Sequence, residues 1–280
     1  MKKIYIIAMT ALLLVACQQK ETLNSNSVIK EKITAHTEID TYIYENFQRP
    51  YNIIVTYNFN APDFEMSKYL YPPTESKIKP LLEIVKKVWI DSYSEVAGAE
   101  FIKKVAPRQI SLIGGYNVNP SGTITLGFAD SGMKITLFNV DQLNTGNHTE
   151  TRQYFHTIQH EYCHIINQKK PFSTTYRTIT PEGYTAAWFN VTLDKANEAG
   201  FITPYSMLND LEDFAEITAT MLGMSRSAWD AKVEAIQSEK GKAAIRRKET
   251  FVVEYFKTQW NIDIYRLQEV VEANMLSVLQ

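Results

Sequence analysis

The stretch HTIQHEYCH (residues 156–164) holds three of the chain's five histidines, at intervals of four residues. It lies within a run of apolar residues at helical spacing that extends from Asn147 to about Asn167. Asn147 precedes Glu150 by three residues, a pattern typical of a helix start, and Pro171 prevents the helix from continuing. The sequence therefore predicts one long, largely buried helix near the middle of the chain.

Two of these histidines suit a metal site. Residues four apart share one face of a helix, so His160 and His164 can direct both imidazoles at one point, as two ligands of a tetrahedral zinc ion must. Glu161 lies about 100° further round the helix, where it can reach a water at the metal without being a ligand. A chance HExxH pattern or a solvated helix face is the simpler alternative, but buried imidazoles and carboxylates need partners.

The stretch contains two further residues with reactive side chains. His156 lies one turn before His160 on the same face and could be a spare ligand. We expect it instead to pack or hydrogen-bond near the site, because three protein ligands and a water already fill a catalytic zinc site. Cys163 points away from that face and is expected to be a small buried core residue.

A third zinc ligand is expected from a later helix. The extended motif HExxHxxGxxH is absent, since residue 167 is Asn and residue 170 is Lys. The segment LNDLEDFAEITATML (208–222) instead offers Glu212 and Glu216 beside apolar residues, four positions apart. The pair suits one carboxylate on zinc and a second that hydrogen-bonds a ligand histidine.

The combination of HEYCH with EDFAE some fifty residues later resembles the gluzincin metallopeptidases, and the second motif is similar to that of anthrax lethal factor. With its N-terminal sequence and length, the chain resembles the zinc metallopeptidase lipoproteins of Bacteroidetes that accompany SusC/SusD-type uptake systems. The resemblance implies that His160, His164 and Glu212 are the ligands of one zinc ion.

The same resemblance implies further roles. Glu161 becomes the general base, and Glu216 becomes the hydrogen-bonding partner of a ligand histidine. Tyr205 precedes Glu212 by seven residues, as in the lethal factor pattern, and could donate to the oxyanion; the alternative is that it is one of sixteen tyrosines with a structural role. Leu211 departs from the family pattern, because it cannot orient a ligand histidine as a polar residue could.

The N-terminus predicts a membrane anchor. Residues 1–16 combine two lysines with a short apolar run and end before Cys17, which resembles the lipobox of bacterial lipoproteins. Residues 17–38 would form the acylated anchor and a polar flexible tether. Gln18 favours the outer membrane by resemblance to sorting rules, with either the periplasmic or the cell-surface face open. An ordinary secretory signal with a chance cysteine is the alternative.

The remaining pattern predicts an α+β fold in residues 39–280. Strands are expected at 52–60, 109–115, 122–129 and 133–140, and a helix at 76–104, giving a β-rich lobe to about residue 170. A helical lobe is expected over 171–280, with helices at 207–223, 225–238, 242–258 and 262–277. The resemblance implies a zincin-like domain with a small mixed or antiparallel sheet, and chain order suggests 133–140 as its edge strand. Residues 171–206 could form a wall of the cleft or pack into the core.

These observations lead to three functional hypotheses. The first is a zinc-dependent peptidase at the outer membrane that cleaves peptide or protein. The second is a non-catalytic accessory lipoprotein that binds peptide or a SusC/SusD-type complex, and the third is a zinc hydrolase of a non-peptide amide or ester. The formal net charge of −2 and pI near 6.2 provide no electrostatic argument for nucleic acid as a partner.

Overall fold

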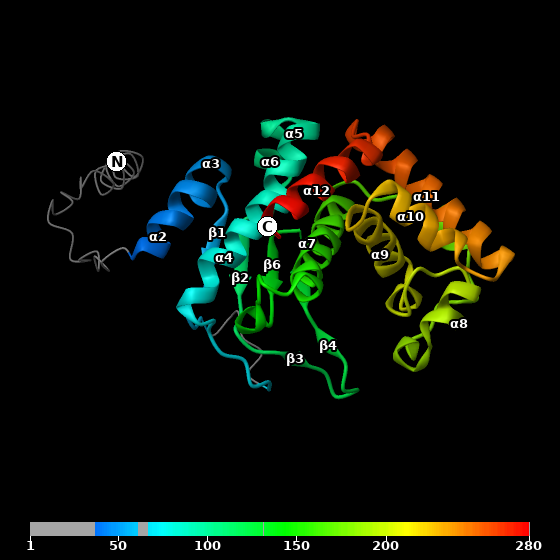
Figure 1. Cartoon of the computed structure of the whole chain (residues 1–280), viewed down its shortest axis with the longest axis horizontal. Coiled ribbons are helices and arrows are strands. Elements are labelled where there is room, and N and C mark those ends of the chain that lie inside the picture. Colours follow the sequence, from blue (N-terminus) through cyan, green and yellow to red (C-terminus); the bar gives the residue numbers. More distant parts are fainter. Residues whose placement is uncertain (1–36, 61–66, 131, 280) are drawn as a thin grey trace, which may run out of the picture. The chain divides into compact units, whose positions relative to one another are not determined.

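The long helix predicted around the histidines is present in the computed structural model, which describes residues 37–60, 67–130 and 132–279. Helix α7 extends from His148 to Lys169. The side chain of Asn147 caps it by accepting hydrogen bonds from the backbone N–H groups of Thr149 and Glu150. Most of α7 is buried, and it lies between the sheet and the C-terminal helices (Figure 1).

A four-stranded mixed sheet packs against α7 in the order β1-β2-β6-β5. Its parallel strands are β1 (Ile54–Thr56), β2 (Gln109–Leu112) and β6 (Lys134–Leu137). Strand β5 (Gly127–Asp130) pairs antiparallel with β6, Gly127 opposite Leu137. A separate hairpin joins β3 (Asn117–Val118) to β4 (Ile124–Thr125), with Val118 opposite Ile124. Strand β1 is much shorter than the strand that the sequence predicted at 52–60.

The prediction that 133–140 forms the sheet edge is wrong. Strand β6 lies between β2 and β5, and β5 is the outer strand beside it. The burial pattern explains the difference: Ile135, Thr136 and Leu137 are all buried, as in an interior strand, whereas Phe128 and Asp130 of β5 are exposed. Chain order had suggested the wrong strand because β5 and β6 form a hairpin that places the earlier strand outside.

The N-terminal lobe contains more helix than the sequence predicted. Its helices are α2 (Glu38–Ile43), α3 (Arg49–Tyr51), α4 (Glu75–Val85), α5 (Ser92–Ala97) and α6 (Ala99–Val105). A π-helical stretch, Lys86–Asp91, joins α4 to α5. The backbone carbonyl of Val88 in this stretch accepts a hydrogen bond from the buried side-chain NH2 group of Gln159 in the middle of α7.

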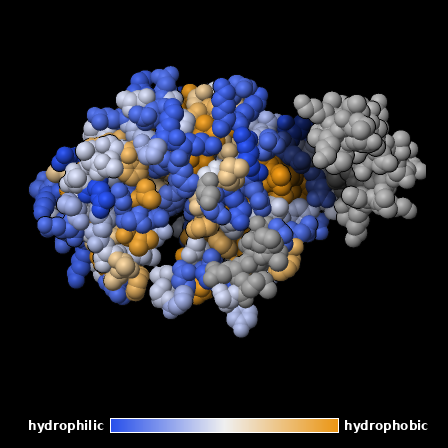
Figure 2. Space-filling model, turned by 180° about the vertical axis from the view of Figure 1, so that it is seen from behind, coloured by the Kyte–Doolittle hydropathy of each residue, from blue (hydrophilic) through white to orange (hydrophobic). Residues whose placement is uncertain are grey.

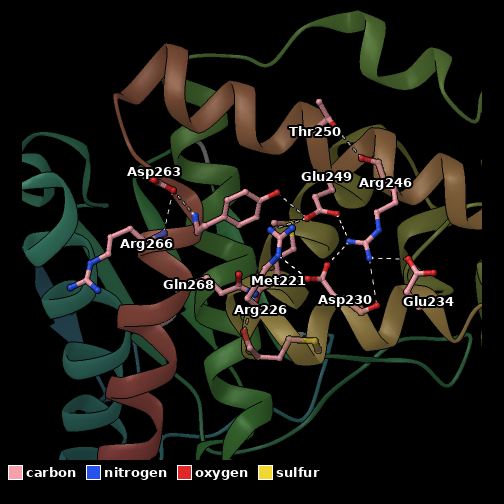
Figure 3. Close-up of polar contacts among 12 residues, drawn as sticks. Met221, Arg226, Asp230, Glu234, Arg246, Glu249, Thr250, Asp263, Arg266 and Gln268 are labelled. Atoms are coloured by element: carbon pink, nitrogen blue, oxygen red, sulfur yellow. Dashed lines mark hydrogen bonds and ion pairs between the residues drawn. The ribbon is translucent and has the colours of Figure 1, made fainter.

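The C-terminal lobe is helical, as predicted. It consists of α8 (Leu193–Glu198), α9 (Asp210–Leu222), α10 (Arg226–Glu234), α11 (Glu239–Trp260) and α12 (Ile264–Val278). Polar side chains connect the last three helices. Arg246 bonds Asp230 and Glu249 at 2.8 Å each (Figure 3). Tyr265 of α12 donates a hydrogen bond to Glu249. These contacts hold α10, α11 and α12 together, and all three of these helices contact α9.

The molecule is therefore α+β, as the sequence predicted. Its described part has a largely hydrophilic face with separate hydrophobic patches (Figure 2), and it contains no helix long and apolar enough to cross a membrane. The predicted signal peptide, Cys17 and nearly all of the tether lie outside the described residues. Cys163 is buried, as expected, and burial raises the pKa of its thiol to about 12.

Candidate metal centre

Three side chains from two helices converge on one point. His160 Nε2 lies 3.0 Å from His164 Nε2 and 3.0 Å from Glu212 Oε2, and the latter two atoms are 3.1 Å apart. A tetrahedral zinc ion with bonds of about 2.0–2.1 Å separates its ligand atoms by about 3.3 Å. The three atoms thus form a triangle of nearly the size that zinc requires, and two imidazoles with a carboxylate are ligands that zinc binds.

Local structure fixes Glu212 in this position. Asn209 caps α9, and its side chain accepts hydrogen bonds at 2.9 Å from the backbone N–H groups of Leu211 and Glu212. Helices α9 and α7 pack closely along their length, so the first turn of α9 faces the HEYCH turn of α7. Leu211 itself is half exposed and takes no part in the ligand triangle.

Glu216, one turn further along α9, contacts the ring nitrogen of His160 that is not part of the ligand triangle. Its Oε1 lies 2.9 Å from His160 Nδ1 and 2.8 Å from His156 Nε2, and its Oε2 accepts a hydrogen bond of 2.7 Å from Thr203. A carboxylate on Nδ1 fixes the imidazole so that Nε2 presents its lone pair to a metal. His156 thus hydrogen-bonds Glu216 at the edge of the ligand triangle, which agrees with the expectation that it lies near the site.

The electrostatics of this cluster favour a cation. Burial alone would lower the pKa of His160, but the neighbouring carboxylates of Glu212 and Glu216 raise it well above its usual value. Burial alone would raise the pKa of Glu212, but hydrogen bonds from His160 and His164 lower it strongly. The cluster therefore stabilises positive charge at the point where the three ligand atoms meet, which is what a divalent ion supplies.

The carboxylate of Glu161 sits between α7 and the edge strand β5. Burial raises its pKa, while His160, His164 and a backbone hydrogen bond from Ala129 of β5 oppose the increase. Gly127 makes the close approach possible: a Cβ there would lie 2.7 Å from Glu161 Oε1 and 2.6 Å from Thr157 Cγ2. A proton acceptor with a raised pKa thus lies beside the ligand cluster and against the sheet edge.

Tyr205 lies on the other side of the cluster. Its ring centroid is 5.8 Å from that of His160 and 4.9 Å from that of Trp188. Burial, followed by the negative charges of Glu212 and Glu161, raises the pKa of the Tyr205 hydroxyl, so it remains a proton donor at neutral pH. Thr203 positions this turn, because its hydroxyl bonds both the amide of Ser206 and the carboxylate of Glu216.

The 171–206 segment combines the two roles that the sequence left open. Tyr176 and Phe201 are fully buried, and Tyr184 donates a hydrogen bond to Asp213. Asp213 also forms a buried ion pair of 2.7 Å with Lys248 of α11, and Lys248 donates to the carbonyl of Gly200. These contacts anchor both ends of a stretch whose middle, at Trp188 and Phe189, lines a cleft.

The cleft has a volume of about 630 Å³ and opens directly beside the ligand cluster. Its walls come from the β3–β4 hairpin, β5, the N-terminal half of α7 and the 171–206 segment. His160, Glu161 and Tyr205 lie on its surface, so a molecule in the cleft would reach the cluster and its proton acceptor.

Comparison with known proteins agrees with this geometry. A family model described as "Putative zinc-binding metallo-peptidase" matches residues 32–265. The chain belongs to this family. A solved structure of a "putative zinc-binding metallo-peptidase" from Bacteroides caccae shares 30% sequence identity and a TM-score of 0.70, covering 90% of this chain and 97% of that chain. No curated protein matches the sequence.

Membership in a zinc-binding metallopeptidase family fits the donor set of the cluster. The structure brings together all six of the site residues expected from the sequence between 160 and 216, namely His160, Glu161, His164, Tyr205, Glu212 and Glu216. Sequence reasoning did not find Gly127 and Thr203. A single glycine and a single threonine carry no motif. Their roles depend on tertiary neighbours, 30 and 34 residues away for Gly127 and 13 residues away for Thr203.

Proposed function

We propose that this protein is a gluzincin-type zinc peptidase that hydrolyses peptide bonds with one zinc ion held by His160, His164 and Glu212. The observation that carries the proposal is the convergence of three ligand atoms within 3.1 Å beside Glu161, at the surface of a cleft large enough for a peptide. Bound zinc would supply a Lewis acid that polarises a carbonyl and makes water a nucleophile at neutral pH.

The chain's own residues supply the remaining chemistry. Glu161 accepts the proton of the attacking water and passes it to the leaving amine, a role that suits a buried carboxylate with a raised pKa. Tyr205 stays protonated and donates to the oxyanion that forms on the substrate carbonyl. Glu216 keeps His160 oriented, and His156 and Thr203 keep Glu216 in place.

The edge strand supports a peptide as the substrate. The carbonyls of Leu126 and Asp130 accept hydrogen bonds from Phe138 and Met133, so these residues turn their backbone groups toward the β6 side of the hairpin. Backbone groups alternate along a strand, so Gly127 and Ala129 face the outer edge, where Ala129 bonds Glu161. An extended peptide could add to this edge and present its backbone to the proton acceptor.

The proposal includes a location and partners. Acylation of Cys17 would anchor the peptidase to the outer membrane, with residues 18–38 as a tether, and a SusC/SusD-type uptake complex is the proposed neighbour. The lipobox-like sequence that ends at Cys17 and the resemblance to zinc metallopeptidase lipoproteins of Bacteroidetes support this location and these partners. Labelling cells with a radioactive or clickable fatty acid should mark the wild-type chain and not Cys17→Ser.

The decisive experiment uses the full chain, purified without chelator. Wild type should contain about one zinc per chain by plasma mass spectrometry and cleave a peptide library. Glu161→Gln should keep the zinc and lose activity by at least about 10³-fold, because it removes the proton acceptor but no ligand. Zinc without Glu161-dependent cleavage of peptides would favour the accessory or non-peptide alternatives, and absence of zinc would contradict the proposal.

A further inference from the structure

Apart from His156, the side chains that line the cleft beyond the metal centre carry no charge. The residues that line it outside the HEYCH turn and Glu216 are Asn119, Ser121, Thr123, Ile124, Thr125, Leu126, Gly127, Gln153, His156, Thr157, Ala186, Trp188, Phe189, Tyr205 and Leu208. His156 is bonded to Glu216. The large apolar groups come from two parts of the chain: Ile124 and Leu126 from the hairpin and the residue before β5, and Trp188, Phe189 and Leu208 from the stretch that leads to α9.

Two of these apolar side chains are about half open to solvent while lining the cleft. Ile124 is 48% exposed and Phe189 is 44% exposed, although both are large and apolar. Solvent-exposed apolar groups that line one cleft together are typical of a site that is covered by a ligand. A charged side chain would lose its hydration there without a partner of opposite charge, which would disfavour binding.

The direction of the edge strand shows which part of a peptide would reach these walls. Gly127 lies against Thr157 and Glu161, whereas Gly132, just after β5, lies against Gln168. Strand β5 therefore runs in the same direction as α7. A peptide that pairs antiparallel with β5, the slightly more stable arrangement, runs opposite to α7. Its carboxyl-side residues then lie over the N-terminal half of α7, and Gln153, His156 and Thr157 of that half line the cleft.

We infer that the cleft is a specificity pocket for a bulky uncharged side chain, aliphatic or aromatic, on the carboxyl side of the cleaved bond, with Ile124 and Phe189 as selecting residues. This inference rests on the proposed peptidase function, because only a peptidase has a cleaved bond relative to which the pocket can be placed. The pocket's chemistry, however, comes from the walls and not from the metal cluster. The selection can therefore be measured both by cleavage and by binding.

The cleavage test uses the full chain and octapeptides that differ only in the residue after the cleaved bond. Wild type should prefer Leu, Phe or Met over Glu and Lys by at least about tenfold in kcat/KM. Ile124→Lys should reduce that ratio and favour Glu at this position. Val118→Lys is the matched control, because Val118 lies directly opposite Ile124 in the hairpin, is 52% exposed and does not line the cleft.

A second pair tests the other wall. Phe189→Ala should weaken the preference for Phe over Ala at the same position, while Leu193→Ala, 46% exposed and outside the cleft, should leave it unchanged. A wild-type preference for a charged or very small residue would overturn the inference. Equal shifts in Ile124→Lys and Val118→Lys would also overturn it.

Binding separates this inference from the proposed function. Fluorescent versions of the same peptides are titrated into the Glu161→Gln variant. This measures their affinity for the cleft and does not depend on turnover. A preference for the apolar peptides that is lost in Glu161→Gln/Ile124→Lys supports the pocket even if wild type cleaves nothing, in which case only the peptidase proposal falls. Equal binding of apolar and charged peptides contradicts the pocket, whether or not wild type is active.

Discussion

Gly127 provides a direct test of how the proton acceptor is held. A Cβ added at this position would lie 2.7 Å from Glu161 Oε1, 2.8 Å from Glu161 Cγ and 2.6 Å from Thr157 Cγ2. The carboxylate must move by about 0.7 Å or more to restore an ordinary contact of about 3.4 Å. No zinc ligand is among these neighbours, so the change should affect Glu161 and leave the ligand triangle intact.

Gly127→Ala should therefore reduce activity more than metal binding. A misplacement of about 1 Å at a reacting group costs up to about 10²-fold in rate, so we expect kcat for a good peptide to fall by about 30- to 100-fold. Overpacking of the α7–β5 contact should lower the free energy of unfolding by about 1–3 kcal/mol. Zinc content should remain near that of wild type.

The assay combines peptide cleavage, zinc content and denaturant unfolding on the same preparations. Gly146→Ala is the matched control, because the nearest atom to its added Cβ would be Asn144 Oδ1 at 3.4 Å. Wild-type kcat in Gly127→Ala would refute the argument that the strand positions Glu161. Loss of zinc would refute it as well, because the perturbation would then have reached the ligands.

Three further substitutions test a proposed ligand, the support of a ligand histidine and the buried ion pair between α9 and α11. Glu212→Ala should reduce zinc to well below one ion per chain after dialysis, measured by plasma mass spectrometry, while full retention would exclude it as a ligand. Thr203→Val should weaken zinc binding by about tenfold in a competition titration, because the 2.7 Å hydrogen bond to Glu216 is lost, and an unchanged affinity would contradict this role. Lys248→Met should destabilise the protein by about 3–5 kcal/mol in urea unfolding, because it leaves Asp213 buried without its ion-pair partner, and adding Asp213→Asn should recover much of the loss. The loss of stability in Lys248→Met should be larger at pH 8 than at pH 5. Burial already raises the pKa of Asp213 in the folded protein to about 6, and removing Lys248 raises it further, so the folded state loses stability relative to the unfolded chain as pH rises above the pKa of an unfolded aspartate. A loss that does not change with pH would contradict the role of the buried carboxylate.

The sequence by itself determined the parts of the site that depend on local geometry. The fixed helical rotation of about 100° per residue places His160 and His164 on one face with Glu161 beside them, whatever surrounds the helix. The same rule made Glu212 and Glu216 a pair. Apolar periodicity likewise predicted α7 and the C-terminal helices, because a helix long enough to cross the core must show its buried face in the sequence.

The tertiary structure alone decided what depends on pairing between distant segments. The sheet order placed β5 outside β6, which chain order had reversed, because hydrogen-bond pairing between short strands leaves little trace in four residues. Gly127 lies against Glu161 only because the tertiary structure packs β5 against α7. Thr203 likewise became a partner of Glu216 only when the 171–206 segment was anchored on α9. A pattern along one helix is thus legible in sequence, whereas contacts between elements are chosen by packing of the whole core.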